Sequence, residues 1–305
     1  MKKTIDFMSF RKVALSVSLL LMLLSFGSLF FKQLNFGLDF TGGTLVDLEF
    51  HEPVRIQSIR DTLNDAGYKG VGVSSFGSNQ RILIKVSGFS SDTLGEEIIS
   101  LLTSKSSTSK IELKRSEFVG PQVGSELRDD GGIAMLLALT IMMIYIAFRF
   151  QSKFAIAAVL ALIHDVVFVF GVFSLFSLDF DLTVLAAILA VIGYSLNDSI
   201  VVSDRIRENF RLNRNEDPEL LINNSLNQTL GRTLVTSLTT MLVLFSLYLL
   251  GGELIKNFSL ALIIGVFIGT YSSIFILSNV LLMTSISGDD LFIEEKKEED
   301  QHELP

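Results

Sequence analysis

Six long apolar segments dominate the pattern of hydrophobic and polar positions along the chain. Each is long enough to cross the hydrocarbon core of a membrane as a helix, because that core is about 30 Å thick and a helix rises about 1.5 Å per residue. Backbone polar groups in lipid must be satisfied within the segment, so each segment is predicted to be helical. The predicted spans cover residues 13–31, 132–149, 154–177, 182–203, 231–250 and 258–283.

The basic residues predict how these helices are oriented. They precede the first helix, occupy the turn between the second and third, and follow the fourth, so all three groups face one side if the N-terminus is cytoplasmic. These residues are Lys2, Lys3, Arg11, Lys12, Arg149, Lys153, Arg205, Arg207, Arg211 and Arg214. Both termini are therefore predicted to be cytoplasmic. A cleaved signal peptide is the alternative for the first segment, but its length and the sequence Phe30-Phe31-Lys32 favour an uncleaved anchor.

Residues 32–131 are too polar to span a membrane and too long for a linker. Alternating apolar positions predict four strands, and helical spacing predicts two helices, in the order β-α-β-β-α-β. The strands are expected over residues 44–50, 71–76, 81–86 and 110–118, and the helices over residues 56–66 and 94–102. This order is typical of a ferredoxin-like α+β fold, which hosts many functions and names none.

The predicted fold class is a membrane all-α bundle of six transmembrane helices with one small α+β (ferredoxin-like) extracytoplasmic domain. We divide the chain into an N-terminus with the first helix (1–31), the extracytoplasmic domain (32–131), helices two to six (132–283) and a cytoplasmic tail (284–305). The tail holds eight acidic residues against two lysines, and is predicted to be a solvated end.

Glycines gather at both joints between the outer domain and the helices. Gly42 and Gly43 follow the first helix, and Gly120, Pro121 and Gly124 precede the second. Glycine adopts backbone angles closed to other residues, so these positions are candidate hinges. Ordinary turn chemistry explains them equally well.

The fourth helix carries Asp198, about four residues inside its predicted cytoplasmic end, with Asn197 beside it. A charge at the bilayer centre costs about 2.5–3.5 kcal/mol on insertion scales, so function is the default hypothesis for such a residue. The functional interpretation is a carboxylate that binds and releases a proton. The alternative is an interface carboxylate wetted by the cytoplasm.

The fifth helix carries a polar stripe of Arg232, Thr236, Thr239 and Thr240 on one face. We expect this stripe to point into the bundle, where Arg232 would meet Asp198 at similar depth. The alternative for Arg232 is a side chain that extends to the membrane surface and anchors the end of the helix.

Two further pairs lie within predicted spans. His164 and Asp165 in the third helix are candidates for a proton relay, although a structural pair that holds helices together is favoured. Gly265 and Gly269 in the sixth helix have the spacing that lets helices approach closely, and predict helix packing.

Composition excludes several classes of function. The chain has no cysteine, which excludes disulfides, thiolate catalysis and cysteine-bound metals. No basic stripe with interleaved aromatic residues is present, so nucleic acid is not an expected partner. No phosphate-binding loop for ATP and no hydrolase or zinc-protease motif occurs, so we expect no enzyme activity and no cofactor or metal, and an ion gradient is the energy source that remains.

Together these motifs resemble the SecF family of protein-export membrane proteins, within the RND transporter superfamily. The resemblance covers nearly the whole chain except the acidic tail. The matching segments are Gly37-Leu38-Asp39-Phe40-Thr41-Gly42-Gly43, Val119-Gly120-Pro121, Glu126-Leu127, His164-Asp165 and residues 192–202, 204–208, 231–240 and 269–274.

The resemblance implies an auxiliary subunit of the Sec translocase that pairs with SecD and uses the proton gradient to promote polypeptide export. It implies proton-passage roles for Asp198 and Arg232. The implied partners are SecD, the SecYEG channel, the translocating preprotein, YajC and membrane lipid, and the implied location is the bacterial inner membrane. The chain supplies only one six-helix half, so a complete proton path would need a separate SecD chain. Half of an RND-type exporter of small molecules or lipids is the alternative, and a purely structural scaffold is a further one.

Overall fold

The computed structural model describes residues 4–68, 70–76, 78–87, 93–105, 110–213 and 216–286, with the Pro121 side chain excepted. Arg214 and most of the predicted acidic tail lie outside the described residues.

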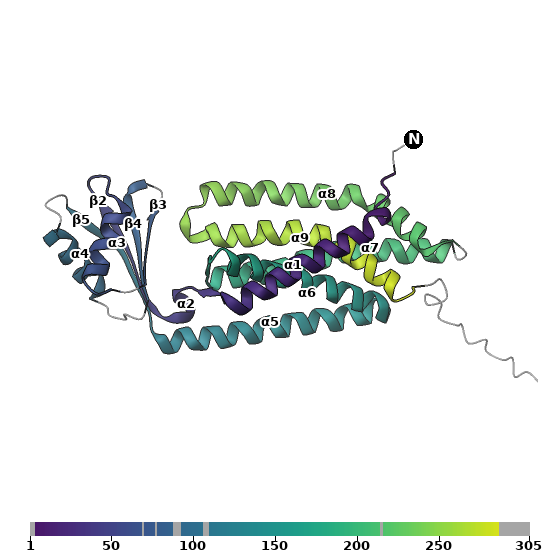
Figure 1. The fold of residues 1–305 in the computed structure, drawn as a ribbon, viewed down its shortest axis with the longest axis horizontal. Helices are drawn as coiled ribbons and strands as arrows, with labels where there is room; N and C mark the ends of the chain where they lie inside the picture. The colour runs from purple at the N-terminus through teal and green to yellow at the C-terminus, as the bar shows by residue number, and fades with distance from the viewer. Residues whose placement is uncertain are drawn as a thin grey trace, which may run out of the picture.

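Six long helices form one elongated bundle, with the outer domain at one end (Figure 1). Each is long and apolar enough to cross a membrane, which confirms the predicted bundle of six transmembrane helices. A short 3-10 helix, η1 (Met8–Phe10), precedes the first of them. The six are α1 (Arg11–Phe31), α5 (Pro121–Arg149), α6 (Ser152–Leu175), α7 (Leu182–Leu212), α8 (Pro218–Leu250) and α9 (Glu253–Met283).

Three of these helices extend far beyond their predicted spans. Helix α5 begins at Pro121 rather than near residue 132, α7 continues to Leu212, and α8 begins at Pro218. Hydropathy marks where lipid begins and ends, whereas a helix continues wherever its backbone bonds and neighbours support it. The polar extensions of α7 and α8 pack on each other, through the hydrogen bond from Asn209 Nδ2 to Ser225 Oγ at 2.7 Å.

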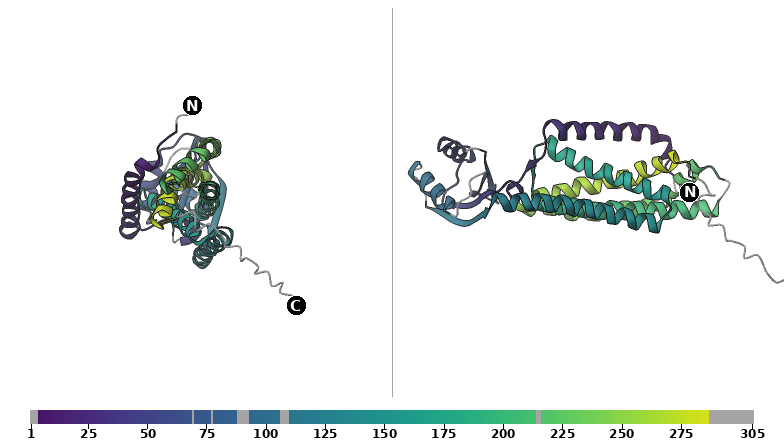
Figure 2. Two further views of the ribbon diagram at one scale, coloured as in Figure 1. Left: turned by 90° about the vertical axis from the view of Figure 1, so that its right-hand side faces the viewer. Right: turned by 90° about the horizontal axis from the view of Figure 1, so that it is seen from below.

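Helix α9 is central to the bundle and packs against α1, α6, α7 and α8. It lies among the other helices in the end-on view of Figure 2. A Cβ atom at Gly265 would overlap the Val191 side chain of α7, and one at Gly269 would lie 3.1 Å from Ser195 Cβ. The two glycines thus sit at the contact between α9 and α7. Helix α5 is peripheral and mostly exposed in this chain.

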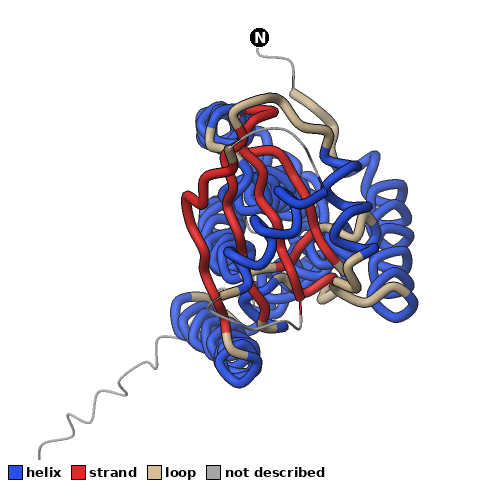
Figure 3. Tube along the Cα trace, turned by 90° about the vertical axis from the view of Figure 1, so that its left-hand side faces the viewer, coloured by secondary structure: helices blue, strands red, loops and turns tan. Residues whose placement is uncertain are grey.

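The outer domain is a four-stranded antiparallel sheet in the order β3-β4-β2-β5 with two helices against it (Figure 3). Its elements are β2 (Gly43–Phe50), α3 (Ile56–Asp65), β3 (Val71–Phe76), β4 (Ser78–Ser87), α4 (Leu94–Lys105) and β5 (Ile111–Val119). This is the split β-α-β arrangement of a ferredoxin-like fold, as predicted. Its core is the apolar face of β2 and β4 packed on α3 and α4, with Leu48, Ile84 and Leu63 fully buried.

A small joint connects the outer domain to the bundle. Strand β1 (Asn35–Phe36) leaves α1 and pairs in parallel with β6 (Asp179–Phe180), which connects α6 to α7. The one-turn helix α2 (Leu38–Thr41) then leads into β2. Phe36, Phe40 and Phe180 pack together at this joint, with ring centroids 5.8–6.1 Å apart. The pairing of β1 with β6 was not predicted, because two-residue strands have no sequence pattern of their own.

Gly43 provides a test of the joint. Its φ is +148°, and a Cβ atom there would collide with the Val86 carbonyl and lie 2.7 Å from Leu38 Cδ2. We expect Gly43→Ala to lower the free energy of unfolding by about 1–3 kcal/mol more than Gly67→Ala, the usual cost of overpacking. Gly67 also has a positive φ, +93°, but no atom within 4 Å of the added Cβ. Thermal unfolding of both variants in detergent measures the difference, and equal losses would contradict a steric role for Gly43.

Candidate functional site

Asp165 of α6 is fully buried and joins three helices at one carboxylate. Its Oδ2 accepts hydrogen bonds from Ser195 Oγ of α7 at 2.5 Å and from Ser272 Oγ of α9 at 2.7 Å. Its Oδ1 lies 3.1 Å from His164 Nδ1. A buried carboxylate with this many donors is stabilised in place, and it ties α6, α7 and α9 together.

His164 extends this cluster toward α1. Its ring lies beside Tyr271 of α9, with centroids 6.4 Å apart. The Tyr271 hydroxyl donates to the Ala14 carbonyl at 2.7 Å and lies 2.9 Å from Ser18 Oγ, so Tyr271 fastens α1 to α9. His164 Nε2 is buried and has no hydrogen-bond partner among the described residues. The pair therefore has structural contacts on one side and an unsatisfied nitrogen on the other.

Asp198 lies on α7, one turn beyond Ser195, and differs from Asp165 in its surroundings. Its side chain is 2% exposed, and its Oδ2 has no hydrogen-bond partner within the described part of the chain. Arg232 of α8 is the charged group that acts on it electrostatically. Unpaired buried polar atoms are rare in folded proteins because they forfeit their hydration, so Asp198 is a candidate for a group that changes its protonation state.

The polar stripe on α8 faces outward in this chain, and the prediction that it points into the bundle is wrong. Arg232 and Thr239 are exposed, and Thr236 and Thr240 are only half-buried. The threonine hydroxyls donate to carbonyls of their own helix, including Thr240 Oγ1 to the Thr236 carbonyl at 2.9 Å. A hydroxyl that bonds to a carbonyl of its own helix needs no partner on a neighbouring helix. The polarity of these residues therefore did not show which face of α8 is buried.

A different stripe of small hydroxyl residues on α8 is the buried one: Ser225, Thr229, Thr233 and Ser237. Ser237 Oγ lies 2.7 Å from Thr270 Oγ1 of α9, and Thr233 Oγ1 is buried without a partner among the described residues. These residues recur every four positions and are small enough for close helix packing. The sequence analysis did not predict this buried stripe, although the regular spacing of its small residues could have revealed it.

A groove between α7 and α8 runs along the predicted cytoplasmic side of Asp198. It has a volume of about 500 Å³ and is lined by Asn197, Arg205, Gln228 and Arg232, among others. Arg205 crosses the groove, because its Nε donates to Gln228 Oε1 at 2.5 Å and its Nη1 to Glu208 Oε2 at 2.6 Å. Asn197 is exposed and shares this groove with Arg232, so both sequence-predicted residues lie on the same polar face.

The two glycine joints touch each other. Gly42 has a φ of +71°, and a Cβ atom at Gly124 would lie 3.0 Å from both the Gly42 nitrogen and the Phe40 carbonyl oxygen. Gly120 precedes α5 with an extended backbone, and Pro121 and Gly124 belong to the first turn of that helix. The chain therefore enters and leaves the outer domain through a single close contact between α2 and α5.

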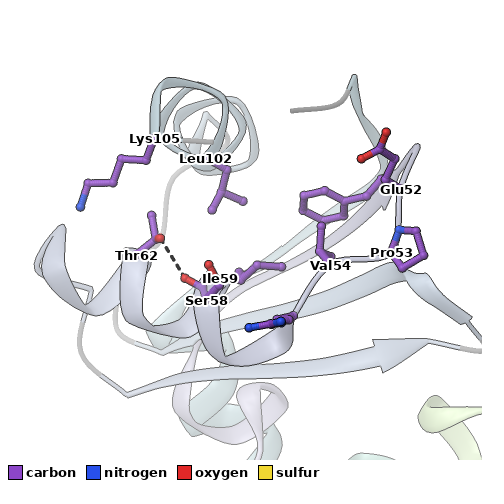
Figure 4. Close-up of a pocket in the computed structure, with 10 residues that line it drawn as sticks. Glu52, Pro53, Val54, Ser58, Ile59, Thr62, Leu102 and Lys105 are labelled. Atoms are coloured by element: carbon purple, nitrogen blue, oxygen red, sulfur yellow. Dashed lines mark hydrogen bonds between the residues drawn. The ribbon is translucent and has the colours of Figure 1, made fainter. Parts of the chain in front are cut away.

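The outer domain has a pocket of about 290 Å³ between α3 and α4 (Figure 4). Its apolar lining includes the buried side chains of Phe50, Ile59 and Leu102. Glu52 and Lys105 are among its charged lining residues. The lining contains no histidine or cysteine.

Comparison with known proteins gives consistent results. The family model described as protein export membrane protein SecD/SecF, C-terminal, matches residues 99–286, and the SecD/SecF GG motif matches residues 27–54. The chain is 47% identical to protein translocase subunit SecF of Pseudomonas aeruginosa, over 97% of this chain and 96% of that protein. It is 40% identical to SecF of Escherichia coli O157:H7, over 100% of this chain and 95% of that protein.

Among solved structures, SecDF of Thermus thermophilus, described as a translocon-associated membrane protein, matches with a TM-score of 0.83 and 39% identity. The match covers 93% of this chain and 39% of that longer chain. A structure of SecDF in a super-membrane-facing form matches with a TM-score of 0.71 over the same shares of each chain.

The hydrogen bonds to Asp165 predict a measurable stability loss. Ser195→Ala removes one donor from a buried carboxylate and should lower the free energy of unfolding by about 1–3 kcal/mol. Ser246→Ala is the matched control, because the exposed Ser246 hydroxyl donates only to the Leu242 carbonyl of its own helix. Thermal unfolding in lipid nanodiscs compares the two, and a Ser195 variant as stable as the Ser246 variant would show that the Asp165 cluster does not hold the helices.

Proposed function

Because the chain belongs to the SecD/SecF family of protein-export membrane proteins, we propose that it works with SecD and uses the proton gradient to promote polypeptide export. It is a SecF-type, multi-pass membrane subunit of the export machinery, a transporter component rather than an enzyme. The proton coupling, the residues that carry it and the wider partners belong to the proposal.

The single observation that carries the proposal is the environment of the Asp198 side chain. Asp198 is buried, one of its oxygens has no hydrogen-bond partner among the described residues, and the cation Arg232 acts on it from α8. Burial generally disfavours a charge, whereas a neighbouring cation favours a negative one. Two opposing influences of this kind make the charge of Asp198 sensitive to small changes in helix position and hydration. A proton that moves across 100 mV supplies about 2.3 kcal/mol, enough to bias such a switch.

The exposed polar face supports a partner within the membrane. Asn197, Arg232 and Thr239 lie at the surface of α7 and α8, inside helices that are apolar enough to cross the bilayer. Polar groups at this depth normally face a protein interior or a water-filled cavity rather than lipid. A second six-helix half from SecD would cover this face and enclose the groove between α7 and α8.

The buried cluster at Asp165 connects this site to the rest of the bundle. Ser195 bonds to Asp165 and stands one turn from Asp198 on α7, so a shift of α7 at Asp198 alters the bonds at Asp165. In the proposal, His164 and Asp165 take part in the proton pathway, together with Asn197, Thr236 and Thr240 on the groove side. The unsatisfied His164 Nε2 provides a position where a proton or water can bind.

The remaining partners follow from the proposed role. The SecYEG channel would supply the exported polypeptide, the outer domain would act on it, and YajC is an additional candidate subunit. In this arrangement the protein lies in the bacterial inner membrane with both termini cytoplasmic and residues 32–131 outside. The basic residues at one end of the bundle support that orientation.

Replacement of Asp198 tests the proton switch. Asp198→Asn preserves size but cannot ionise, so we expect gradient-dependent stimulation of export to be abolished while the protein remains in the membrane. Asp129→Asn, at an exposed carboxylate on α5, is the control and should retain the stimulation. Export is measured in membrane vesicles with and without an imposed proton gradient, and normal stimulation by the Asp198 variant would defeat the assignment.

The partner face is tested by cysteine cross-linking, which the cysteine-free sequence makes specific. Val243 continues the Arg232 stripe on α8 and is 60% exposed, whereas Leu19 on α1 is 62% exposed. A cysteine at Val243 should cross-link to a co-expressed SecD carrying cysteines along its membrane helices, and a cysteine at Leu19 should not. Cross-linking at Leu19 alone would place the partner at α1 instead.

A further inference from the structure

The face of the sheet opposite α3 and α4 lies against the outer end of the bundle. Ile82, Ile84 and Val86 of β4 point into the domain core, so Leu83 and Lys85 point to the other face. Leu83 is nevertheless only 4% exposed. It shares a cavity of about 250 Å³ with Asp179 of β6 and with Leu254 and Asn257 of α9. The outer domain therefore contacts the end of the bundle at β6 and α9, and a cavity remains between them.

Asp179 is the polar centre of this contact. Its Oδ2 forms an ion pair with Lys85 Nζ at 2.7 Å, and its Oδ1 accepts a hydrogen bond from Asn35 Nδ2 at 2.8 Å. Its main-chain carbonyl accepts from Asn257 Nδ2 of α9 at 3.1 Å. One residue thus joins the outer domain, the exit from α1, the start of α9 and the loop before α7.

The position of Asp179 relates this contact to the proton site. Helix α7 begins at Leu182, three residues after Asp179, and carries Asp198 sixteen residues further on. At about 1.5 Å per residue, some 24 Å of continuous helix separate that beginning from Asp198. A rigid helix transmits a shift or rotation at Asp198 to its outer end, where Asp179 stands.

Lys85 occupies a central position in the sheet of the outer domain. It lies on β4, a central strand, opposite Leu45 of β2 and Gly72 of β3 in the sheet register. A force applied at Lys85 therefore acts on the sheet as a whole rather than on an edge. Both side chains are about one-third exposed, so the pair can break and re-form without leaving a charge in a dry interior.

We propose that the Lys85–Asp179 ion pair is the positioning contact that couples movement of α7 to the outer domain. This inference rests on the proposed function above, since it names how the proton site acts on the domain that meets polypeptide. Lys85 and Asp179 do not carry protons in this scheme. They hold the outer domain in register with α7.

The structural part is tested on the full chain in lipid nanodiscs, with spin labels at Asn64→Cys on α3 and Leu250→Cys at the end of α8. Both positions are exposed, and the sequence has no other cysteine. Lys85→Gln and Asp179→Asn should each broaden the distance distribution between the labels, and the double variant should add little. Asparagine retains an oxygen for Asn35, so Asp179→Asn isolates the charge. Unchanged distributions would overturn the proposal whatever drives export.

Lys256→Gln is the matched control. It breaks an ion pair with Glu253 of 2.9 Å and similar exposure at the same end of the bundle, but within a single helix. Its distance distribution and its export should match those of the parent protein. Broadening as large as that of Lys85→Gln would overturn the specific role of the interdomain pair.

The functional part is measured in membrane vesicles containing the complete export machinery. Lys85→Gln and Asp179→Asn should lower gradient-dependent stimulation of export about fivefold, the lower end of typical coupling between sites. Full stimulation by a variant whose labels show a released domain would overturn the coupling role. If the parent protein itself showed no gradient response, the proposed function would fail, and the label distances would decide separately whether the ion pair holds the domain.

Discussion

The cost of burying a carboxylate in a helical bundle explains the main features of the membrane part. A buried carboxyl group loses its proton only with difficulty unless the resulting charge is paired and hydrogen-bonded. Asp165 and Asp198 meet this constraint in opposite ways. Asp165 accepts bonds from two serines and contacts His164, so it acts as a node that fixes three helices. Asp198, one turn from that node, has an oxygen without a hydrogen-bond partner among the described residues and a cationic neighbour on another helix.

The same constraint applies to the exposed polar face of α7 and α8. Arg232, Asn197 and Thr239 are exposed at depths where lipid would otherwise surround them. Satisfied hydroxyls on α8 reduce the cost of that exposure but do not provide for the arginine. In the proposed function, a partner half that covers α7 and α8 would enclose the open groove of about 500 Å³ between them.

A single helix, α7, connects Asp198 to the contact between the bundle and the outer domain. Helix α7 carries Asp198 and begins next to β6, where Asp179 meets Lys85 of the sheet. Glycines at the α2–α5 contact keep the connection narrow, and the cavity beneath Leu83 leaves room for displacement. This arrangement is the physical basis of the proposed coupling, because a continuous helix and a continuous sheet lie between Asp198 and the rest of the outer domain.

The sequence by itself determined the elements, because hydropathy and side-chain periodicity are local properties. The six helices, the β-α-β-β-α-β order and the candidate Asp198 were all visible in runs of neighbouring residues. Only the tertiary structure decided which polar face is buried, since Arg232 and Thr233 are adjacent in sequence yet lie on different sides of α8. It also decided that Ser195 and Ser272 bond to Asp165, that Gly124 touches Gly42, and that Lys85 reaches Asp179. Those contacts join residues 30 to 107 positions apart, and no local pattern encodes which distant side chains will meet.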